Sequence, residues 1–430
     1  MLRALYSLAW YAALPLLPLR LAWRGRRERG YLEAMGERFG RFAVPRPPGD
    51  VLWVHAVSVV ETRAAAPLVE WLRSAHPRAT ILLTTMTAAG RETGRTLYGE
   101  RVVQAWLPYD APFAVRRFLD HWAPRAGLLM ETELWPNLVH GCRDHGVPLY
   151  LVNARMSPKS AAGYARFAAL TRPMLGALAG VAAQTAADAR RLQALGAPEI
   201  AITGNLKFDV DVPDAMRERG AALRERFGAG RRVLLCASTR EGEETLLLDA
   251  LARQPLPADA LLLLVPRHPQ RFGDVEQLLR ARGVRSVRRS ADAPVPPTTQ
   301  VVLGDTMGEM LAYCAAADVA FVGGSLLPLG GQNLIEPIAL GVPTLVGPHT
   351  FNFAEATARA IDAGAALRVD DADALVTRAI ALLGDAAARG RMGEAAAAFH
   401  AAHQGAAARL AAWLAPRLAA APALSRRGAG

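Results

Sequence analysis

The chain has 430 residues, of which 52% are hydrophobic and 21% are charged. This composition excludes an intrinsically disordered chain, and the length is enough for two globular domains. Fifty basic residues against 39 acidic ones leave a formal net charge of +11, which favours an anionic partner: nucleic acid, an anionic membrane surface or a phosphorylated substrate.

The first segment, "ALYSLAWYAALPLLPL" at residues 4–19, is apolar, and the basic "RLAWRGRRERG" follows it at 20–30. The apolar run is shorter than the ~20 residues of a membrane-spanning helix, and Pro15 and Pro18 interrupt it. A cleaved signal peptide would carry its charges before the apolar run. We therefore expect residues 1–30 to form an anchor that lies on the membrane, with its arginines on anionic head groups. A core helix with a solvated basic end is the alternative.

Beyond residue 50, short apolar runs alternate with helical patterns. The runs are nearly continuous in apolar residues, which is typical of parallel strands buried on both faces. Repeated alternation of strand and helix predicts an α/β protein with doubly wound sheets. The predicted strands cover residues 51–57, 80–86, 102–107, 126–131, 148–154, 180–185, 200–205, 232–238, 260–266, 283–289, 300–305, 318–324, 343–347 and 366–369.

A polar stretch with a proline and a glycine cluster, near residues 206–230, breaks this series. We interpret it as a linker followed by the first helix of a second domain. The predicted domains are therefore 31–212 and 213–420, with an Ala-rich helical end at about 376–420 in the second. Two such domains would face each other across a cleft, and ligands of open α/β sheets bind beyond the carboxyl ends of the strands.

The strongest local motif is "FVGGSLLPLGGQNLIEPIALGVPTLVG". A predicted strand ends at Gly323 and Gly324, and a helix begins near Asn333. Glycine lets the backbone approach a ligand closely, and a helix N-terminus supplies free N–H groups for a phosphate. Glu336, in the first turn, could accept hydrogen bonds from a ribose diol. These features predict a nucleotide site. The alternative is a tight turn in which Glu336 only complements the helix dipole.

Other polar residues follow strands of the second half. Arg267, in "LLVPRHPQRF", could bind a phosphate or a base carbonyl through its fork of donors. The segment "GDTMGEM" offers backbone N–H groups and Glu309. In "CASTREGEE", Ser238 or Thr239 is expected to cap a helix that has acidic residues in its first turn.

In the first half, three charged residues come at or after the ends of predicted strands: Glu61, Glu131 and Lys207. Glu61 on its own would be interpreted as an acid at a helix N-terminus. The D-x-D of Asp209 and Asp211 could suggest a metal-bound nucleotide sugar, but an acidic linker is favoured because no other hard oxygen ligands flank it. Three distant cysteines and nine histidines without metal-ligand spacing predict neither a disulfide framework nor a metal site.

Taken together, these stretches resemble the Kdo transferases, the 3-deoxy-D-manno-octulosonic acid transferases of lipopolysaccharide assembly. The most specific parts are "METELWPN" and the ordered set "VPRHP", "RF" and "GDTMGE". "HAVSVVET", "NARMSPKSAAGY", "GNLKFD" and "GPHTFNF" accompany them, so that the resemblance covers nearly the whole chain. The family has the GT-B fold, with two facing Rossmann-like domains, which agrees with the predicted α/β architecture.

The resemblance implies inverting transfer of Kdo from the donor substrate CMP-Kdo to the lipid A precursor lipid IVA, with no metal and no cofactor. The implied partners are CMP-Kdo, this acylated and phosphorylated acceptor and an anionic membrane surface, without nucleic acid. The implied location is the cytoplasmic face of the inner membrane. Glu61 would be the general base, and Glu131 and Lys207 would assist the transition state. The implied CMP contacts are Pro266, Arg267, Met307, Gly308, Glu309, Asn333, Leu334, Ile335 and Glu336.

Two positions depart from the family pattern. Val60 stands where the family usually has glycine, and a β-branched residue resists a positive φ and would fill space near the acceptor. The nucleotide loop reads "GGQNLIE" where many members have "GGHNPLE". Two alternatives therefore stay open: another GT-B glycosyltransferase that uses a UDP- or ADP-sugar, and a non-catalytic lipid-binding relative.

Overall fold

The structure is a computed structural model that describes residues 2–26, 28–228 and 230–421. Its contacts divide the chain into two compact units. Unit 1 combines the residues up to Asp209 with those from Gly405 onward, and unit 2 runs from Val210 to Gln404. The predicted boundary after residue 212 lies close to the observed one after Asp209. Each unit is built on its own sheet and its own core.

Unit 1 contains a seven-stranded parallel sheet with the order β3-β2-β1-β4-β5-β6-β7. The central strands are apolar and buried on both faces, as the sequence pattern predicts, whereas the edge strand β7 is half-buried to exposed. Their bounds are β1 (Val51–His55), β2 (Thr80–Thr85), β3 (Val103–Trp106), β4 (Ala126–Met130), β5 (Leu149–Ala154), β6 (Gly180–Ala183) and β7 (Ile200–Ile202).

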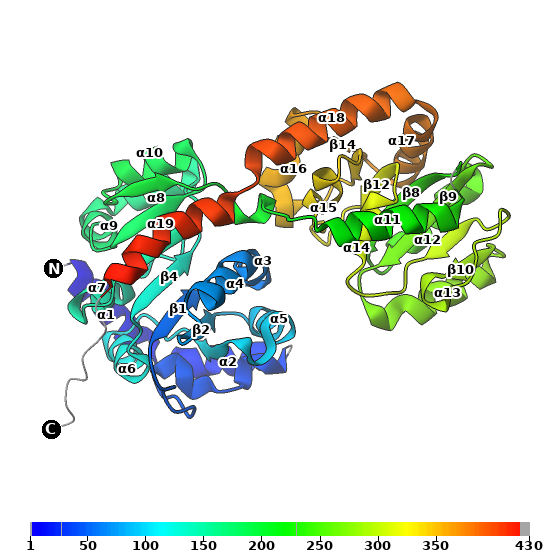
Figure 1. The fold of residues 1–430 in the computed structure, drawn as a ribbon. Coiled ribbons are helices and arrows are strands. Elements are labelled where there is room, and N and C mark those ends of the chain that lie inside the picture. The colour runs from blue at the N-terminus through cyan, green and yellow to red at the C-terminus, as the bar shows by residue number, and fades with distance from the viewer. Residues whose placement is uncertain (1, 27, 229, 422–430) are drawn as a thin grey trace. The chain divides into compact units, whose positions relative to one another are not determined.

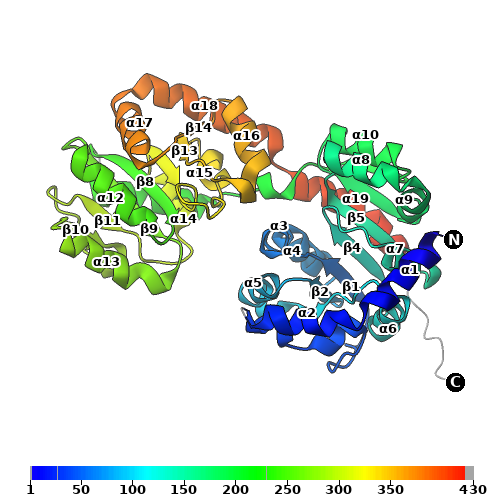
Figure 2. The same cartoon turned by 180° about the vertical axis from the view of Figure 1, so that it is seen from behind.

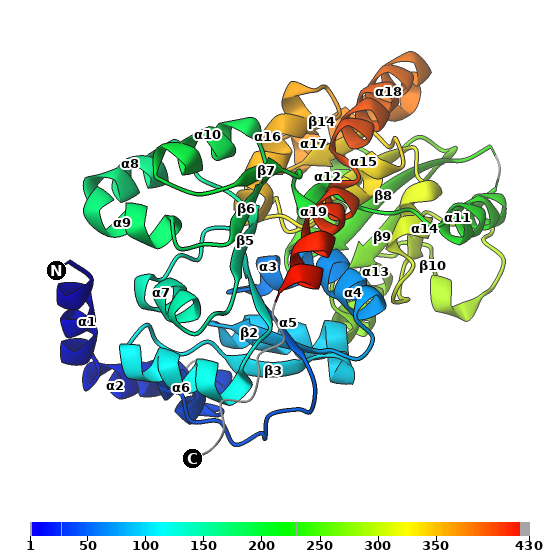
Figure 3. The same ribbon diagram turned by 60° about the vertical axis from the view of Figure 1, so that its left-hand side comes forward.

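Helices cover both faces of this sheet, and alternate residues of each strand supply two separate cores. Val51 and Trp53 of β1 pack with α6, α7, α9 and α10, whereas Leu52 and Val54 pack with α3, α4, α5 and α19. Figure 3 shows α6 and α7 on one side of the sheet and α4 and α19 on the other. The helices are α3 (Val59–Ala64), α4 (Ala66–Ala75), α5 (Ala88–Tyr98), α6 (Pro112–Trp122), α7 (Pro136–Asp144), α8 (Pro158–Arg166), α9 (Ala168–Leu175), α10 (Ala186–Ala194) and α19 (Ala406–Ala420).

The C-terminal helix α19 corrects the predicted second domain, which had included residues up to 420. Leu410, Leu414 and Leu418 repeat every fourth residue, so they form one apolar stripe, and this stripe is buried in the core of unit 1. Asp209 fixes the start of the helix, because its carboxylate accepts hydrogen bonds from Gly405 N at 2.8 Å and Ala407 N at 2.5 Å. Figure 1 shows α19, in red, among the elements of unit 1.

The N-terminal segment forms α1 (Leu2–Ala13) and α2 (Leu16–Gly25), drawn in dark blue in Figure 2. No residue of α1 is buried, which excludes a core helix there, whereas α2 buries Leu17 and Leu21 against Trp106. Large apolar side chains remain exposed along both helices: Leu2, Leu5, Leu8, Tyr11, Leu16, Leu19 and Trp23. Among the described residues no single helix is long and apolar enough to cross a membrane. The bent pair α1 and α2, at 57°, reaches that length and composition only when both are taken together.

Unit 2 repeats the architecture with the strand order β10-β11-β9-β8-β12-β13-β14, again parallel. One face of the sheet packs on α12, α13 and α17, and the other on α11 and α14. The strands are β8 (Arg232–Thr239), β9 (Ala260–Pro266), β10 (Ser286–Arg288), β11 (Val301–Leu303), β12 (Val319–Val322), β13 (Thr344–Val346) and β14 (Ala366–Arg368). The helices are α11 (Asp214–Phe227), α12 (Glu243–Arg253), α13 (Phe272–Ala281), α14 (Met310–Ala315), α15 (Ile335–Ala339), α16 (Ala354–Asp362), α17 (Ala372–Gly384) and α18 (Ala386–His403).

Candidate active site

The carboxyl edge of the sheet in unit 1 has two glutamates at its topological switch point. The chain leaves β1 toward β2 on one side, and β4 occupies the other side of β1. Glu61 follows β1 in the first turn of α3, and Glu131 directly follows β4. Ligands of open α/β sheets bind where the strand order reverses, so this edge is the expected place for a reacting group.

The carboxylate of Glu61 turns back onto its own loop. Its Oε2 accepts a hydrogen bond from Val57 N at 2.6 Å, and its Oε1 lies 3.4 Å from the donor Ser58 Oγ. Burial and then the negative charge of Glu131 raise the pKa of Glu61 to about 7. Glu61 therefore both holds the start of α3, as the simple interpretation predicts, and has a proton affinity suited to a general base near neutral pH.

Val60 is accommodated without backbone strain. It lies in the first turn of α3, and the described residues with positive φ do not include it. The expectation that a β-branched residue would conflict with a positive φ at this position is therefore wrong, because the position is helical. Its side chain is half-buried beside Glu61.

Glu131 and Lys207 form an ion pair. Lys207 Nζ lies 2.5 Å from Glu131 Oε1, and both side chains are largely buried, with 17% and 16% of their surfaces exposed. The backbone of Glu131 has φ +59°, a left-handed conformation that costs a non-glycine residue ~1–3 kcal/mol. Glu131 N also donates to Val152 O at 3.0 Å. A charged residue kept in a strained conformation at this edge is typical of a functional site.

Asn153 explains how Lys207 reaches Glu131 from the far edge of the sheet. Lys207 follows β7, and two strands separate β7 from β4. The chain returns across the ends of those strands, where Asn153 Oδ1, at the end of β5, accepts a hydrogen bond from Leu206 N at 3.0 Å. Asn153 is fully buried and has φ +50°. It thus holds the turn that presents Lys207.

Asp110 stabilises the loop that runs from Glu131 to the start of α7. Its two carboxylate oxygens accept hydrogen bonds from Asn137 N at 2.9 Å and Leu138 N at 2.7 Å. These N–H groups lie in the first turn of α7 and have no partner within the helix. Ser7 Oγ donates to Asn137 Oδ1 at 3.0 Å, so α1 touches the same helix start.

In unit 2, Arg267 and Glu309 follow the neighbouring strands β9 and β11. Glu309 is buried, and its carboxylate already forms two ion pairs. Arg289 lies 3.2 Å and Arg219 3.5 Å from its Oε1. Met307 and Gly308 beside it are exposed. The guanidinium of Arg267, in contrast, has no hydrogen-bond or ion-pair partner within the part of the chain that the structure describes, so it is available to an anion.

The glycine-rich loop after β12 is held by a buried carboxylate. Glu243 accepts hydrogen bonds from Gly324 N at 2.6 Å, Leu326 N at 2.9 Å and Arg240 N at 2.9 Å. It is 1% exposed. Gly323 has to be glycine because a Cβ there would lie 2.6 Å from Ser238 O. The loops after β8 and β12 are therefore fastened together at the switch point of this sheet.

The segment 333–336 divides into half-buried and buried residues. Asn333 and Glu336 are half-buried, whereas Leu334 and Ile335 are 1% exposed and belong to the interior. Ile335 N already donates to Asn333 Oδ1 at 3.0 Å. The predicted cap at Ser238 or Thr239 is wrong: both residues belong to β8, and Gly242 precedes α12.

Comparison with known proteins identifies the family. Residues 33–210 match the family described as 3-deoxy-D-manno-octulosonic-acid transferase (kdotransferase). The chain is 48% identical to the 3-deoxy-D-manno-octulosonic acid transferase of Bordetella pertussis, over 94% of this chain and 96% of that protein. The chain belongs to the Kdo transferase family. The protein of the same name from Haemophilus influenzae is 38% identical over 85% of this chain and 87% of its own.

The solved glycosyltransferase from Rickettsia africae supports the fold of this Kdo transferase. It is 12% identical, covers 87% of this chain and 100% of its own, and gives a TM-score of 0.51. At this identity the likeness concerns the fold alone. Two parallel, doubly wound sheets and the family together establish a GT-B glycosyltransferase, as the sequence predicts.

The structure brings the predicted residues of the Kdo transferase together within each unit. Glu61, Glu131 and Lys207 share the carboxyl edge of one sheet, and the predicted nucleotide residues follow β9, β11 and β12 of the other. Three residues hold the loops that carry these predicted residues. Asp110 and Asn153 had no predicted role, and Glu243 was predicted only as an acidic residue in the first turn of a helix. Their only sequence signal is a polar residue at or beside an apolar run, and their partners are distant along the chain.

Proposed function

We propose that the protein transfers Kdo from CMP-Kdo to the phosphorylated, acylated lipid A precursor lipid IVA, with inversion at the anomeric carbon and without a metal. One observation carries this proposal: a glutamate with a pKa of about 7 stands at the switch point of unit 1 beside an ion pair of Glu131 and Lys207. The resemblance of the motifs around these residues to those of the family supports the choice of donor and acceptor.

Glu61 acts as the general base in this proposal. A sugar hydroxyl is a weak nucleophile, so a carboxylate has to take its proton while the new bond forms. The bond from the anomeric carbon of Kdo to the CMP phosphate breaks in the same step, and the oxygen of the acceptor attacks from the opposite side. Positive charge develops on the Kdo ring, where carboxylate charge such as that of Glu131 stabilises the transition state.

The leaving group needs no metal in this proposal because it departs as a phosphate with a low pKa. Arg267 can hold that phosphate through its free donors, and the exposed backbone of Met307 and Gly308 adds N–H groups. Among the described residues, no group of three or more His, Cys, Asp or Glu is arranged to hold a metal ion. The carboxylate of Asp209, the first residue of the D-x-D pair, already accepts hydrogen bonds from the backbone at the start of α19.

The decisive test is incubation with CMP-Kdo and tetraacylated lipid IVA, in the presence of EDTA, with mass spectrometry of the products. We expect one or more Kdo additions by the native protein. Glu61→Ala should lose transfer by ~10²–10⁴-fold, the usual contribution of a general base. Glu70→Gln, on the exposed surface of α4, is the matched control and should retain full activity. Full activity of Glu61→Ala would refute the assignment of the base.

The same protein and substrates also distinguish the proposed function from two competing ones. Tighter binding of UDP or ADP than of CMP would indicate a different nucleotide sugar. Lipid binding without turnover of CMP-Kdo would indicate a non-catalytic relative. If the side chain of Val60 crowds the acceptor, Val60→Gly should raise the rate of transfer. Because Val60 already has a helical backbone, such a gain would come from the space released and not from a change of φ.

We further propose that α1 and α2 lie on the cytoplasmic face of the inner membrane, an anionic surface. Their exposed leucines and Trp23 would enter the leaflet, and Arg20 and Arg26 are exposed nearby for the head groups. Leu5→Glu should weaken binding to anionic phospholipid vesicles by about tenfold or more in a sedimentation assay. Leu246→Glu, a comparably exposed leucine on α12, is the control. Equal sedimentation of both variants with the native protein would contradict this location.

A further inference from the structure

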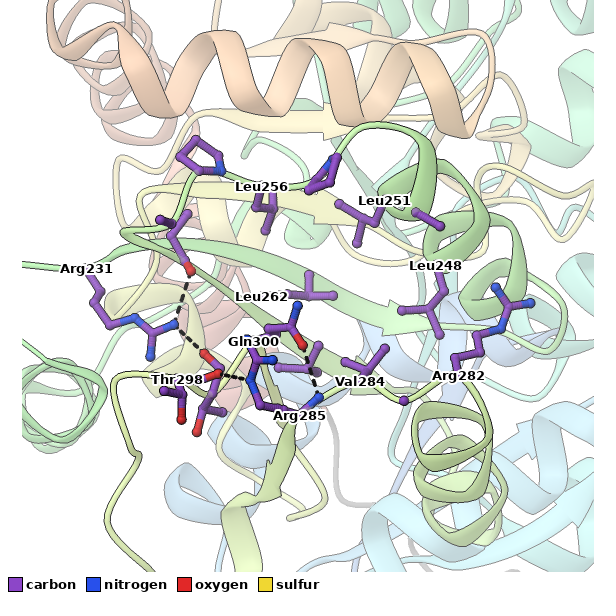
Figure 4. Close-up of a pocket in the computed structure, with 18 of the residues that line it drawn as sticks. Arg231, Leu248, Leu251, Leu256, Leu262, Arg282, Val284, Arg285, Thr298 and Gln300 are labelled. Carbon is purple, nitrogen blue, oxygen red and sulfur yellow. Dashed lines mark hydrogen bonds between the residues drawn. The ribbon is translucent and has the colours of Figure 1, made fainter.

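Unit 2 has a pocket of about 600 Å³ at the amino ends of β8, β9 and β11, the end of the sheet opposite to the predicted nucleotide residues. Figure 4 shows its lining. The volume lies within the range of small-molecule sites. All the residues that line it belong to unit 2, and none of them has a role in the proposed transfer.

One wall of the pocket is apolar. Leu248 and Leu251 of α12, Leu256 of the following loop, Leu262 of β9 and Val284 form its surface, as Figure 4 shows. Leu262 is 1% exposed and Leu248 5% exposed, so the deep part is continuous with the core. Such a wall fits a hydrocarbon chain.

Arg231 gives the pocket an unusual cation. Its Nη2 donates to the carbonyl oxygens of Ala260 at 3.1 Å and Thr299 at 2.5 Å, which fixes the guanidinium in place. Its Nε and Nη1 are buried and have no hydrogen-bond partner. A buried donor without an acceptor costs ~1–3 kcal/mol, more when it is charged, so an anion placed beside this guanidinium would stabilise it.

The surrounding charges leave this cation uncompensated. Arg285 also lines the pocket, and its Nε donates to Thr298 O at 2.7 Å. Arg282 pairs with Asp249, but neither Arg231 nor Arg285 forms an ion pair within the described part of the chain. Asp259, which precedes β9, pairs with Arg232. Burial lowers the pKa of Arg231, which agrees with a guanidinium that lacks a counter-charge.

We propose that this pocket binds an amphipathic anion with a single alkyl chain: the chain packs on the leucines, and the anionic head is held by the positive charges of Arg231 and Arg285, which both line the pocket. The site is separate from the proposed transfer and does not depend on it. Either a free fatty acid or the anionic end of a lipid chain has this chemistry.

The test titrates the full-length protein with decanoate below its micelle concentration, by isothermal calorimetry. We expect saturable binding at one site. Decanol, which has the same chain without the charge, and inorganic phosphate, which has the charge without the chain, should each bind at least about tenfold more weakly. A decanoyl phospholipid with a phosphate head is titrated in the same way. Whichever of this lipid and decanoate binds more tightly shows whether the natural ligand is a lipid or a free fatty acid.

Two variants locate the binding. Arg231→Met removes the charge and keeps the aliphatic volume, and should weaken decanoate binding by about tenfold or more. Leu251→Trp fills the pocket from its half-buried wall and should abolish binding. Arg253→Met, an exposed arginine of the same helix outside the pocket, is the matched control.

Several outcomes would overturn the proposal. They are absence of saturable decanoate binding, equal binding of decanol, or decanoate binding that survives in Leu251→Trp, which would place it on another apolar surface such as α1. If Arg231→Met does not fold, the comparison of decanoate with decanol and the Leu251→Trp variant still decide the question.

Discussion

At the residue scale, the pKa of Glu61 depends on four neighbours with opposing effects. Burial and the charges of Glu131 and Glu133 raise it, whereas the hydrogen bond from Val57 N and the charge of Lys207 lower it. The raised value of about 7 places the ionisation of Glu61 near neutral pH, and a base acts only when it is deprotonated.

The first prediction concerns this ionisation. The rate of Kdo transfer should rise about tenfold per pH unit below pH 7 and level off above it, because only the carboxylate form of Glu61 accepts a proton. Glu61→Gln should lower the rate by ~10²–10⁴-fold and remove this dependence. A rate profile that is flat from pH 5 to 8 in the native protein would contradict the role of Glu61.

The second prediction separates the two members of the ion pair by the sign of their effects. Glu131→Gln removes a negative charge near Glu61, so the midpoint of the pH–rate profile should move to lower pH. Lys207→Met removes a positive charge, so the midpoint should move to higher pH. Both variants should also lose rate. The profiles are measured under single-turnover conditions, and shifts in the same direction would show that the pair does not act on Glu61 by charge.

At the element scale, the start of α7 positions the loop that carries Glu131. A helix leaves its first four N–H groups without partners inside the helix, and here Asp110 satisfies two of them from another loop. Burial raises the pKa of Asp110 to about 7, and its hydrogen bonds to α7 oppose that shift.

The third prediction is that Asp110→Ala lowers the free energy of unfolding by about 2–4 kcal/mol, because two buried N–H groups lose their acceptor. It should also lower the rate of transfer, since α7 begins directly after the loop of Glu131. Asp120→Ala, on the exposed surface of α6, is the control and should change the free energy of unfolding by less than about 0.5 kcal/mol. Urea titration followed by tryptophan fluorescence measures the free energy of unfolding of both variants. Equal stability of the two variants would contradict the proposed role of Asp110 at the start of α7.

The sequence patterns predict the strands correctly but misplace the cap of α12. Every predicted strand is present within the described residues, because most of them are short apolar runs between turn signals, which are a local property of the sequence. The cap of α12 was misplaced, because Ser238 and Thr239 continue β8 and the carboxylate of Glu243 bonds to a loop some 80 residues away. A side chain whose partner is that distant leaves no local pattern.

At the scale of the whole molecule, the chain enters unit 1, crosses to unit 2 and returns to unit 1 through α19. All eight tryptophans lie in unit 1, the last of them, Trp413, on α19 against Tyr150. Tryptophan fluorescence therefore reports on the unfolding of unit 1 and not on that of unit 2.

The fourth prediction uses this asymmetry. Leu414→Ala should destabilise unit 1 by about 2–5 kcal/mol, because it opens a cavity in a fully buried contact between α19 and the sheet. Leu383→Ala, equally buried on α17 of unit 2, should leave the transition seen by tryptophan fluorescence unchanged. If Leu383→Ala moves that transition as far as Leu414→Ala does, the two units do not unfold separately.

Local patterns in the chain were enough to predict two α/β units, the parallel strands within them, and the charged residues that end those strands, since each depends on residues adjacent in sequence. Only the tertiary structure decided that Lys207 crosses two strands to reach Glu131, that Asp110, Asn153 and Glu243 hold the site loops, and that α19 belongs to unit 1. These features join residues tens to hundreds of positions apart. Such contacts form only when the sheets bring those residues together, so no local periodicity or spacing encodes them.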